Sequence, residues 1–592
     1  ARRQRQMCIR DRLMDKEIIE SIKLYEKFKR VSIAEFFEKN RHLLGFENPK
    51  KALLITVKEL VDNSLDACEE YKILPDITIS IEDMGEGIYK VTVEDNGPGI
   101  PYDKVPEIFG SFLYGSKFHR YISSRGKQGI GASAVVLYGQ LTTMKPASII
   151  TKTPDSDKAI YYEIKIDVAN NSPQILKQKY MSWSKSHGTS VTVYLRGMYT
   201  KGKQSVDEYI QFTALANPHA QIIYYPPSGE KIVYKRLTNN VPELKEIKPH
   251  PYGIEIGVLE RMLKNSRHSK LSEFLIKEFS SIGKKTAEEI LKKAKLEDKN
   301  PKELTEKEIE KLYLALHSVK LRAIPSNVIV TLGEDLIRKT LTNMFNPEFV
   351  TSIKRRPAVY RGNPFIVEIG IAYGGDIKEF RLLRFANRVP LLYKSGECAI
   401  TLAAKEINWK RYGLNGEEGS LPTDPIIILV HVASVWIPFT SESKEAIAPY
   451  PEILKEIELG LKQALRDIAI YINKKRSIEG ISDKYKTLYG YGLEVARILS
   501  EILNKDEKEV SNIIKDRVKK ELLKDIMDIL ITTREIKTLL RENKDDQAIK
   551  LIKNILKGVI ESNIMSEKEL SEMIKEVINV VKEKKLHLEE NI

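Results

Sequence analysis

The stretch Lys58-Glu59-Leu60-Val61-Asp62-Asn63-Ser64-Leu65-Asp66-Ala67 places an acid, an amide and a second acid on one side of an apolar stripe. On a helix Glu59, Asn63 and Asp66 share a face, because their spacing is i, i+4 and i+7. The surrounding residues 50–72 therefore predict an amphipathic helix packed on a core. Oxygen ligands of this kind suit magnesium, and a carboxylate can orient or deprotonate a water molecule. For this helix taken alone, a solvated polar face is the alternative.

Two glycine-rich turns follow this helix. Asp95-Asn96-Gly97-Pro98-Gly99 comes directly after the alternating segment Tyr89–Glu94, which predicts a strand. Glycines let the backbone approach a flat ligand, and the Asp95 carboxylate can accept a hydrogen bond from an exocyclic amine. The second turn, Arg125-Gly126-Lys127-Gln128-Gly129-Ile130-Gly131, precedes a predicted helix, Ala132–Tyr138, whose N-terminal N–H groups can cradle phosphates. Each turn alone is a common pattern.

Together and in this order, the helix and the two turns resemble the GHKL ATPase fold of gyrase-type topoisomerases, heat-shock chaperones, mismatch-repair clamps and histidine kinases. A fourth piece, His187-Gly188-Thr189-Ser190, enters a predicted strand where that fold places a late Gly-Thr element. The resemblance implies ATP and Mg²⁺ as cofactors, with Glu59 as the general base and Asn63 as the magnesium ligand.

The same resemblance implies the remaining nucleotide contacts. Asp95 is expected to read adenine N6, Gly97 and Gly99 to give clearance, and Thr189 to support the adenine site. Asp62 and Asp66 are expected to lie behind the groups that touch the nucleotide. Ser116 and Lys117 are expected in a lid before the phosphate loop. The expected phosphate loop consists of Gly126, Lys127, Gln128, Gly129, Ile130, Gly131, Ala132 and Ser133.

The flanking sequence resembles one family of this class, the B subunits of archaeal-type DNA topoisomerase VI, a type IIB enzyme. The resemblance covers about residues 30–475. The matching segments are Ala34-Glu-Phe-Phe-Glu-Lys-Asn, Ile73-Leu-Pro-Asp, Tyr138-Gly-Gln, Lys248-Pro-His-Pro-Tyr-Gly, Gly333-Glu-Asp-Leu-Ile, Asn387-Arg-Val-Pro-Leu-Leu-Tyr, Trp409-Lys-Arg-Tyr-Gly and Lys444-Glu-Ala-Ile-Ala.

This resemblance implies a multidomain α+β protein with a GHKL (Bergerat) ATPase sandwich. Residues 1–13 are interpreted as a non-native extension ahead of Met14. The expected domains are an N-terminal strap and ATPase domain over 14–238, a helix-two-turns-helix domain over 239–322, a βαβ-type transducer over 323–475 and a helical C-terminal region over 476–592.

The family also implies an ATP-hydrolysing topoisomerase (isomerase) subunit. ATP binding would dimerise two copies and trap a DNA duplex, and a partner A subunit, in an A2B2 heterotetramer, would supply the DNA-cleaving tyrosine. The loop Thr440–Ala448 resembles the transducer loop whose lysine reaches the γ-phosphate, which makes Lys444 the expected residue. Lys284, Lys285, Lys292 and Lys293 are candidate DNA-phosphate contacts, with a solvated helix surface as the alternative. Work on DNA implies a cytoplasmic, nucleoid-associated location.

Composition agrees with this interpretation and excludes other classes. The formal net charge of +14 is compatible with a nucleic-acid partner. Three cysteines cannot build a disulfide framework, and no apolar run reaches the roughly 18 residues of a membrane span. The longest apolar candidate, Pro425–Phe439, is rich in β-branched residues and predicts a buried strand, marked by Ile426–Ile437. No membrane partner is expected.

Four other functions stay open at this stage. A chaperone or a mismatch-repair clamp of the same ATPase class would lack the helical insert near residues 249–321. A histidine kinase would need an acceptor histidine upstream of the ATPase domain, where His42 is the single candidate. A scaffold with an inactive nucleotide site would not need Glu59 beside Asn63.

Overall fold

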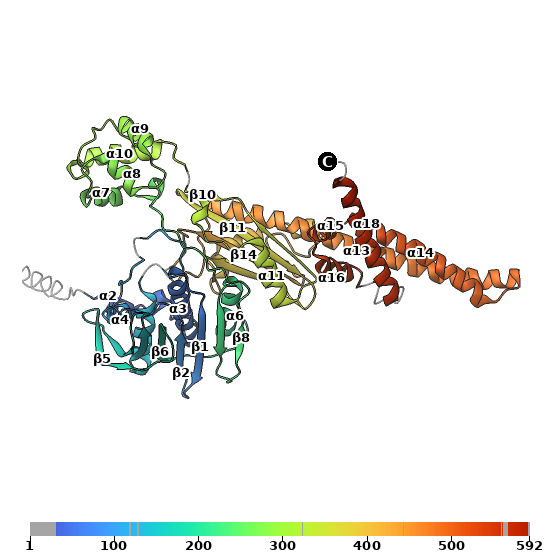
Figure 1. Cartoon of the computed structure of the whole chain (residues 1–592), viewed down its shortest axis with the longest axis horizontal. Coiled ribbons are helices and arrows are strands. Elements are labelled where there is room, and N and C mark those ends of the chain that lie inside the picture. Colours follow the sequence, from blue (N-terminus) through green and yellow to red (C-terminus); the bar gives the residue numbers. More distant parts are fainter. Residues whose placement is uncertain are drawn as a thin grey trace, which may run out of the picture. The chain divides into compact units, whose positions relative to one another are not determined.

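The computed structural model describes residues 31–117, 120–126, 129–322, 324–441, 443–557, 559 and 566–589. The interpreted extension 1–13 lies outside the described residues. The fold divides the chain into two compact units (Figure 1). The N-terminal unit comprises residues 1–248 together with 441–444, and the C-terminal unit comprises residues 249–440 together with 445–592.

An eight-stranded sheet forms the framework of the N-terminal unit, in the order β5-β4-β3-β6-β2-β1-β7-β8. Its strands pair antiparallel except for β1 and β7, which run parallel. The predicted strand Tyr89–Glu94 is β2. The strands are β1 (Asp76–Asp83), β2 (Ile88–Glu94), β3 (Ala147–Lys152), β4 (Ala159–Asp167), β5 (Ser172–Met181), β6 (Gly188–Arg196), β7 (Gln221–Tyr225) and β8 (Ile232–Tyr234).

Helices cover the buried face of this sheet. Every second residue of β1, β2 and β4 is buried, as expected for a sheet with one face on the core. Helices α3 and α5 pack on the central strands, and α3 is the amphipathic helix that the sequence predicted (Figure 1). The helices are α2 (Ile33–Lys39), α3 (Pro49–Glu70), α4 (Val105–Gly110), α5 (Gly131–Thr143) and α6 (Val206–Ala216). This two-layer arrangement confirms the predicted α+β class.

A cluster of short helices opens the C-terminal unit and has its own apolar core. Leu259, Leu271, Phe274 and Leu312 are fully buried in it. Four helices form the cluster, in the region where the sequence turns Lys/Glu-rich and helical. They are α7 (Ile256–Lys264), α8 (Leu271–Glu278), α9 (Lys284–Ala294) and α10 (Glu306–Ser318).

A second sheet follows, in the order β10-β11-β14-β12-β13, with β9 paired to β11. Strand β14 is buried along its whole length, so the predicted buried strand is confirmed. It ends at Ser434 rather than at Ile437, because Ser434 Oγ accepts the N–H of Trp436 and starts a turn. The elements are α11 (Glu334–Phe345), β9 (Phe349–Lys354), β10 (Ala358–Tyr360), β11 (Asn363–Tyr373), β12 (Arg381–Ala386), β13 (Val389–Pro390), α12 (Ala399–Lys405) and β14 (Ile426–Ser434).

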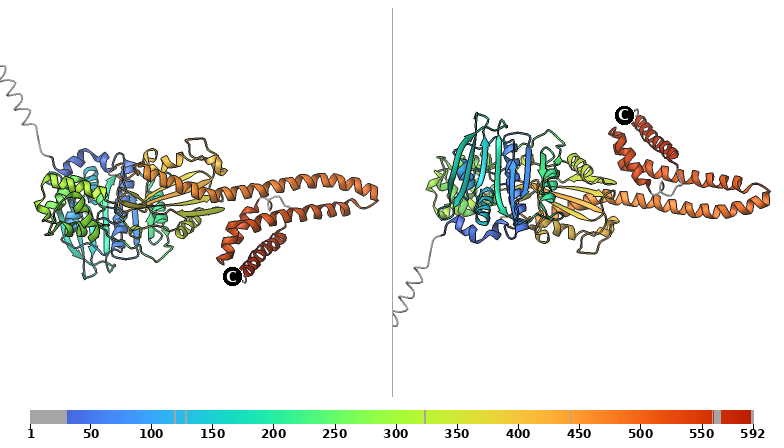
Figure 2. Two further views of the ribbon diagram at one scale, coloured as in Figure 1. Left: turned by 90° about the horizontal axis from the view of Figure 1, so that it is seen from above. Right: turned by 90° about the horizontal axis from the view of Figure 1, so that it is seen from below.

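Long helices complete the C-terminal unit, as the helical periodicity of the tail predicts. Helix α13 (Pro451–Leu503) runs for 53 residues and lies beside α14 (Glu507–Thr532), forming a hairpin (Figure 2). The shorter helices α15 (Arg534–Arg541), α16 (Asp545–Ile555) and α18 (Glu567–Glu589) follow. None of the helices in the described ranges combines the length and apolar character needed to cross a bilayer.

Candidate active site

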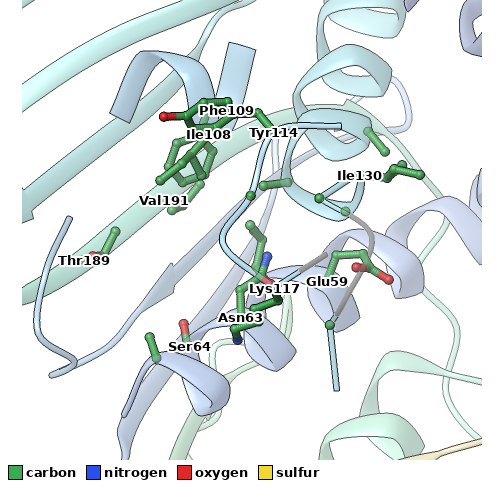
Figure 3. A pocket seen from close by; sticks show the side chains of 18 of the residues that line it. Glu59, Asn63, Ser64, Ile108, Phe109, Tyr114, Lys117, Ile130, Thr189 and Val191 are labelled. Carbon is green, nitrogen blue, oxygen red and sulfur yellow. The ribbon is translucent and has the colours of Figure 1, made fainter. Parts of the chain in front are cut away.

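A cavity of about 600 Å³ lies in the N-terminal unit, a size typical of small-molecule sites. Its walls come from α3, from the turn after β2, from the start of α5, from β6 and from residues 443–444, so the predicted segments do converge (Figure 3). Of the predicted site residues, those that line it are Glu59, Asn63, Asp95, Gly99, Ser116, Lys117, Gly126, Gly129, Ile130, Gly131, Ala132, Thr189 and Lys444.

Helix α3 supplies two of the polar side chains. Its N-terminus is fixed by Asn48, whose side chain accepts the N–H of Lys51 at 2.9 Å, and by Pro49 in the first turn. Four turns of the helix are almost wholly buried. Glu59 and Asn63 project from it toward the cavity (Figure 3). The polar face is therefore a cavity wall rather than an ordinary solvated surface.

The Glu59 carboxylate lies at the start of α5. A Cβ added at Gly131 would lie 2.1 Å from Glu59 Oε2, so any other residue there would displace the carboxylate from this position. The other oxygen, Oε1, accepts a hydrogen bond from Lys58 Nζ at 2.8 Å. Burial raises the pKa of Glu59, but the charges of Lys58 and Lys444 outweigh it and leave the pKa below its ordinary value. The carboxylate is consequently ionised at neutral pH.

Three donors orient the Asp95 carboxylate. Oδ1 accepts the N–H groups of Gly97 at 2.9 Å and Thr189 at 3.0 Å, and Oδ2 accepts the Ser64 hydroxyl at 2.8 Å. Burial raises the pKa of Asp95, and these hydrogen bonds oppose that shift. The fixed carboxylate lines the cavity and has an oxygen lone pair to offer to a donor on a ligand.

The glycines beside Asp95 allow close backbone packing. Gly99 has φ 72°, and a Cβ there would lie 2.1 Å from the carbonyl oxygen of Lys152. Gly188 has φ 137°, and a Cβ there would lie 2.3 Å from the carbonyl oxygen of Asp95. Gly97, by contrast, is not among the residues that line the cavity, and its N–H is used on Asp95. Its expected clearance role stays a prediction.

The predicted phosphate loop is only partly visible. Gly126, Gly129, Ile130, Gly131 and Ala132 line the cavity, and the N-cap residue of α5, Ile130, has an apolar side chain that makes no cap hydrogen bond. Lys127 and Gln128 lie outside the described residues. Ser133 is 1% exposed and does not line the cavity, and its hydroxyl donates to the carbonyl oxygen of Ile130 at 3.0 Å.

Asp66 shares the helical spacing of Glu59 and Asn63, and the resemblance implies a place for it behind the groups that touch the nucleotide. Its carboxylate is buried and does not line the cavity, because Arg125 and Lys117 draw it into ion pairs at 2.8 and 3.0 Å. It also accepts the N–H of Gly126 at 3.1 Å. Arg125 also forms an ion pair with Glu69, with 2.7 Å between Arg125 Nη2 and Glu69 Oε1. Burial alone would raise the pKa of Asp66. The charges of Lys117 and Arg125 outweigh that effect and lower the pKa to about 2. Asp66 thus fastens the start of the phosphate loop to α3.

The expected lid residues lie at the same place. Ser116 and Lys117 both line the cavity, and Lys117 is held by Asp66. Lys117 and Asn63 approach the same region of the cavity from different segments (Figure 3). An anion bound there would meet a cation from the lid and N–H groups from α5.

Lys444 reaches the cavity from a segment more than 250 positions later than Thr189 and Val191 and more than 300 later than the phosphate loop. Its Nζ donates to the carbonyl oxygen of Arg125 at 3.0 Å. The residue has φ 53°, in the left-handed region, and its N–H bonds Ser441 O at 3.0 Å. Burial lowers the pKa of Lys444, while Glu59 raises it again in part. An ammonium on a tight turn therefore faces the phosphate-loop backbone and the Glu59 carboxylate.

Sequence reasoning missed the charged groups behind the cavity. Lys58, buried beside Glu59, and Arg125, buried beside Asp66, were not expected to contribute. A lysine next to an acid, such as Lys58 before Glu59, is common on solvated helices, and an arginine in a Gly/Ser-rich loop, such as Arg125, is common on solvated loops. The sequence therefore carries no signal that these two are buried.

The residues present fit a magnesium ion that arrives with a nucleotide. No group of three or more His, Cys, Asp or Glu side chains in the described parts of the chain is arranged to hold a metal by itself. Magnesium keeps several waters and is bound by one or two protein ligands plus phosphates. Asn63, on the cavity wall near Gly126, offers one amide oxygen of that kind.

Comparison with known families agrees with this geometry. Residues 48–196 match the family of histidine kinase-, DNA gyrase B- and HSP90-like ATPases. Residues 325–484 match the transducer of the topoisomerase VI B subunit.

Similar proteins are named as the B subunit of type 2 DNA topoisomerase 6. The one from Methanococcoides burtonii is 45% identical over 497 residues, covering 83% of this chain and 80% of its own. The one from Archaeoglobus fulgidus is 45% identical over 494 residues, covering 82% of each chain. The one from Metallosphaera sedula is 39% identical over 522 residues, covering 86% of this chain and 96% of its own.

Proposed function

The chain belongs to the family of type 2 DNA topoisomerase 6 B subunits, and from that premise we propose that it binds and hydrolyses ATP to drive DNA strand passage. One observation carries the proposal. Glu59, Asp95 and Lys444, from three distant parts of the sequence, line a single cavity. The family also sets aside the chaperone, mismatch-repair, kinase and scaffold alternatives.

We place the adenine at the Asp95 end of the cavity. The Asp95 carboxylate accepts the N6 amine, Gly97 and Gly99 give the ring clearance, and Thr189 supports the carboxylate from β6. The triphosphate runs toward α5, where the N–H groups of the loop Gly126–Ser133, Lys127 and Gln128 included, surround it together with Ser116 and Lys117. The supports are the fixed orientation of Asp95 and the apolar N-cap residue of α5, Ile130, whose side chain makes no cap hydrogen bond.

Hydrolysis is assigned to Glu59. The Glu59 carboxylate orients a water molecule and takes its proton while the water oxygen bonds to the γ-phosphorus and the bond to the β–γ bridging oxygen breaks. Asn63 would hold Mg²⁺, which when bound offsets charge on the phosphate oxygens. The depressed pKa of Glu59 keeps the carboxylate in the form that accepts a proton.

Lys444 is the proposed sensor of the γ-phosphate. It belongs with the N-terminal unit, whereas its chain neighbours Thr440 and Glu445 belong with the C-terminal unit. A phosphate that attracts the Lys444 ammonium therefore acts on a backbone that continues directly into the transducer region. ATP binding and hydrolysis become two states of that segment.

The partners follow from the family. We propose an A2B2 heterotetramer with a topoisomerase VI A subunit, which makes the double-strand break, and dimerisation of this chain on ATP binding to capture a second duplex. Double-stranded DNA is contacted through phosphates, with the exposed Lys284, Lys285, Lys292 and Lys293 of α9 as candidates. Because DNA is the substrate, we propose that the protein acts at the nucleoid, in the cytoplasm. The domain boundaries given above remain proposals.

The test is purification of the full chain with a candidate A subunit, followed by ATP-dependent relaxation and decatenation of plasmid DNA. We expect both activities with ATP and neither without nucleotide. A complex that relaxes plasmid equally well without ATP, or a chain that fails to bind a non-hydrolysable ATP analogue, would show the proposal to be wrong.

A further inference from the structure

Lys58 precedes Glu59 on α3 and has no role in the scheme above. Its side chain is 8% exposed, unusually low for a lysine. Lys58 Nζ lies 2.8 Å from Glu59 Oε1 and 3.3 Å from Asp62 Oδ2. The ammonium therefore bridges two carboxylates of its own helix beneath the cavity wall.

The helix geometry alone does not produce this bridge. Side chains at i and i+4 are neighbours on a helix, which accounts for Lys58 and Asp62, but side chains at i and i+1 do not face each other. Lys58 reaches Glu59 because burial keeps its ammonium out of solvent, where a lysine would otherwise extend. A buried ammonium is stable only when it is paired. The two carboxylates raise the pKa of Lys58 despite its burial, so it remains charged.

Asp62 is anchored from a second helix. Tyr209 of α6 donates its hydroxyl to Asp62 Oδ1 at 3.0 Å, and both side chains are buried. A continuous chain of contacts runs from Tyr209 through Asp62 and Lys58 to Glu59 Oε1. The opposite oxygen, Oε2, is the one beside Gly131 at the start of α5.

We propose that Lys58, held by Asp62 and Tyr209, is a positioning residue that fixes the Glu59 carboxylate for ATP hydrolysis. The inference rests on the proposed function, because it requires Glu59 to be the general base. Lys58 touches neither nucleotide nor water in this scheme. It occupies Oε1 and so leaves Oε2 as the oxygen directed at the attacking water.

The charges around Glu59 support the assignment of Oε1 to Lys58 and of Oε2 to the attacking water. The groups facing the carboxylate are Lys58 from its own helix and Lys444 from the segment 441–444, and Asp62 lies behind Lys58. Lys444 is assigned to the γ-phosphate and leaves the carboxylate when ATP binds, whereas Lys58 stays. Catalysis of phosphoryl transfer depends on positioning and charge stabilisation. In such a reaction, an ionised carboxylate that is held in one direction can orient the attacking water.

The main experiment compares two buried lysines of α3. Lys58→Met removes the bridge, and Lys51→Met is the matched control, because Lys51 is 3% exposed, pairs with Glu47 and does not line the cavity. In the full chain with the A subunit, we expect kcat for ATP hydrolysis to fall about tenfold to a hundredfold in Lys58→Met. KM and the affinity for a non-hydrolysable ATP analogue stay within about twofold. Lys51→Met keeps the wild-type kcat per folded molecule.

Further variants separate positioning from stability. Lys58→Arg restores part of kcat, because a guanidinium can also donate to both carboxylates. The loss of kcat should be smaller in Asp62→Asn than in Lys58→Met, and smaller still in Tyr209→Phe. Because Tyr209→Phe removes a single oxygen atom, it serves as a folded variant if Lys58→Met does not fold. Loss of the Lys58 charge raises the pKa of Glu59, so the acid limb of the kcat profile moves to higher pH in Lys58→Met.

The outcomes distinguish this inference from the proposed function. A wild-type complex without ATPase activity overturns the proposed function itself. An active wild type whose Lys58→Met variant keeps kcat within twofold, or loses no more than Lys51→Met, overturns the role of Lys58 and leaves the proposed function standing. A Tyr209→Phe variant with wild-type kcat would show that Tyr209 of α6 does not help to position Glu59.

Discussion

Helices α3 and α13 bury their side chains according to opposite rules. Helix α3 hides charged side chains, whereas the buried side chains of α13 are apolar apart from two serines, and none of its described charged residues is buried. The buried charges of α3 are Lys51, Lys58, Asp62, Asp66 and Glu69. The buried apolar side chains at the start of α13 are Ile453, Ile457, Leu461, Ala464, Leu465 and Ile468.

The difference separates a helix built around a site from a helix built for support. Burial of a charge is costly unless it is paired, and a pair is seldom better for stability than a well-packed apolar group. Helix α13, which serves packing alone, buries apolar side chains. Apart from Lys51, which pairs with Glu47, these charges of α3 have partners near the cavity or at its back, so their presence is best explained by the site.

Glu59→Ala tests this contrast with the largest expected effect. The variant loses the proposed general base, so ATP turnover falls about 10²- to 10⁴-fold while nucleotide binding persists. Steady-state ATPase and analogue-binding assays measure the two quantities. The control is Glu70→Ala, on the same helix but paired with Arg120 outside the cavity, which keeps its turnover. Normal turnover in Glu59→Ala rejects the assignment.

Arg125→Met sharpens the contrast on the stability side. The guanidinium is fully buried and paired with Asp66 and Glu69, so its removal leaves two carboxylates buried without it. The free energy of unfolding should drop by about 3–5 kcal/mol in denaturant titrations. Arg120→Met, which removes a side chain 31% exposed, should cost about 1 kcal/mol or less. Equal losses would mean that burial does not separate the two arginines.

Leu461→Ala is the corresponding test of α13. Leu461 is fully buried in the apolar core of the C-terminal unit, and its truncation should cost about 2–5 kcal/mol of stability. Because no cavity residue is involved, ATPase activity per folded molecule should stay within about twofold of the wild type. Thermal unfolding and turnover, measured on the same preparation, check both statements. A folded variant that cannot hydrolyse ATP would end the view of α13 as support alone.

Lys444→Ala gives a smaller effect that depends on pH. Only the protonated amine attracts a γ-phosphate, and burial lowers the pKa of Lys444 from 10.5 in the nucleotide-free protein. The affinity of the wild type for ATP should therefore weaken as the pH rises through that lowered pKa, and the variant should lack this dependence. Supercoil relaxation should suffer more than ATP binding. Relaxation at the wild-type rate in Lys444→Ala contradicts the proposed sensor.

The exposed lysines of α9 form a third class, with the smallest expected effect. Lys292 and Lys293 are exposed and are not among the residues that line the cavity, so their replacement by alanine should leave stability and ATPase activity unchanged. If they contact DNA phosphates, the slope of log K for DNA binding against log salt should become less steep by about 2. An unchanged slope assigns both to the ordinary solvated surface.

Local pattern predicted much of this protein. The helical spacing of Glu59 and Asn63 predicted their shared face, and alternation predicted β2, because side-chain direction follows the backbone period. A continuous apolar run rich in β-branched residues predicted β14 as a buried strand. Periodicity also predicted a helical tail. Motif order and flanking segments predicted the family, which the matches over 48–196 and 325–484 confirm. None of this required knowledge of which residues meet across the fold.

Tertiary structure decided which charges the site can use. Asp66 has the right helical spacing for the cavity face, yet Arg125 and Lys117 turn it into a buried anchor. Lys58 looks like an ordinary surface lysine in sequence, and its bond to Glu59 exists only because neighbouring elements bury it. Pairing and desolvation are properties of distant segments brought together, and helical or strand period carries no information about them.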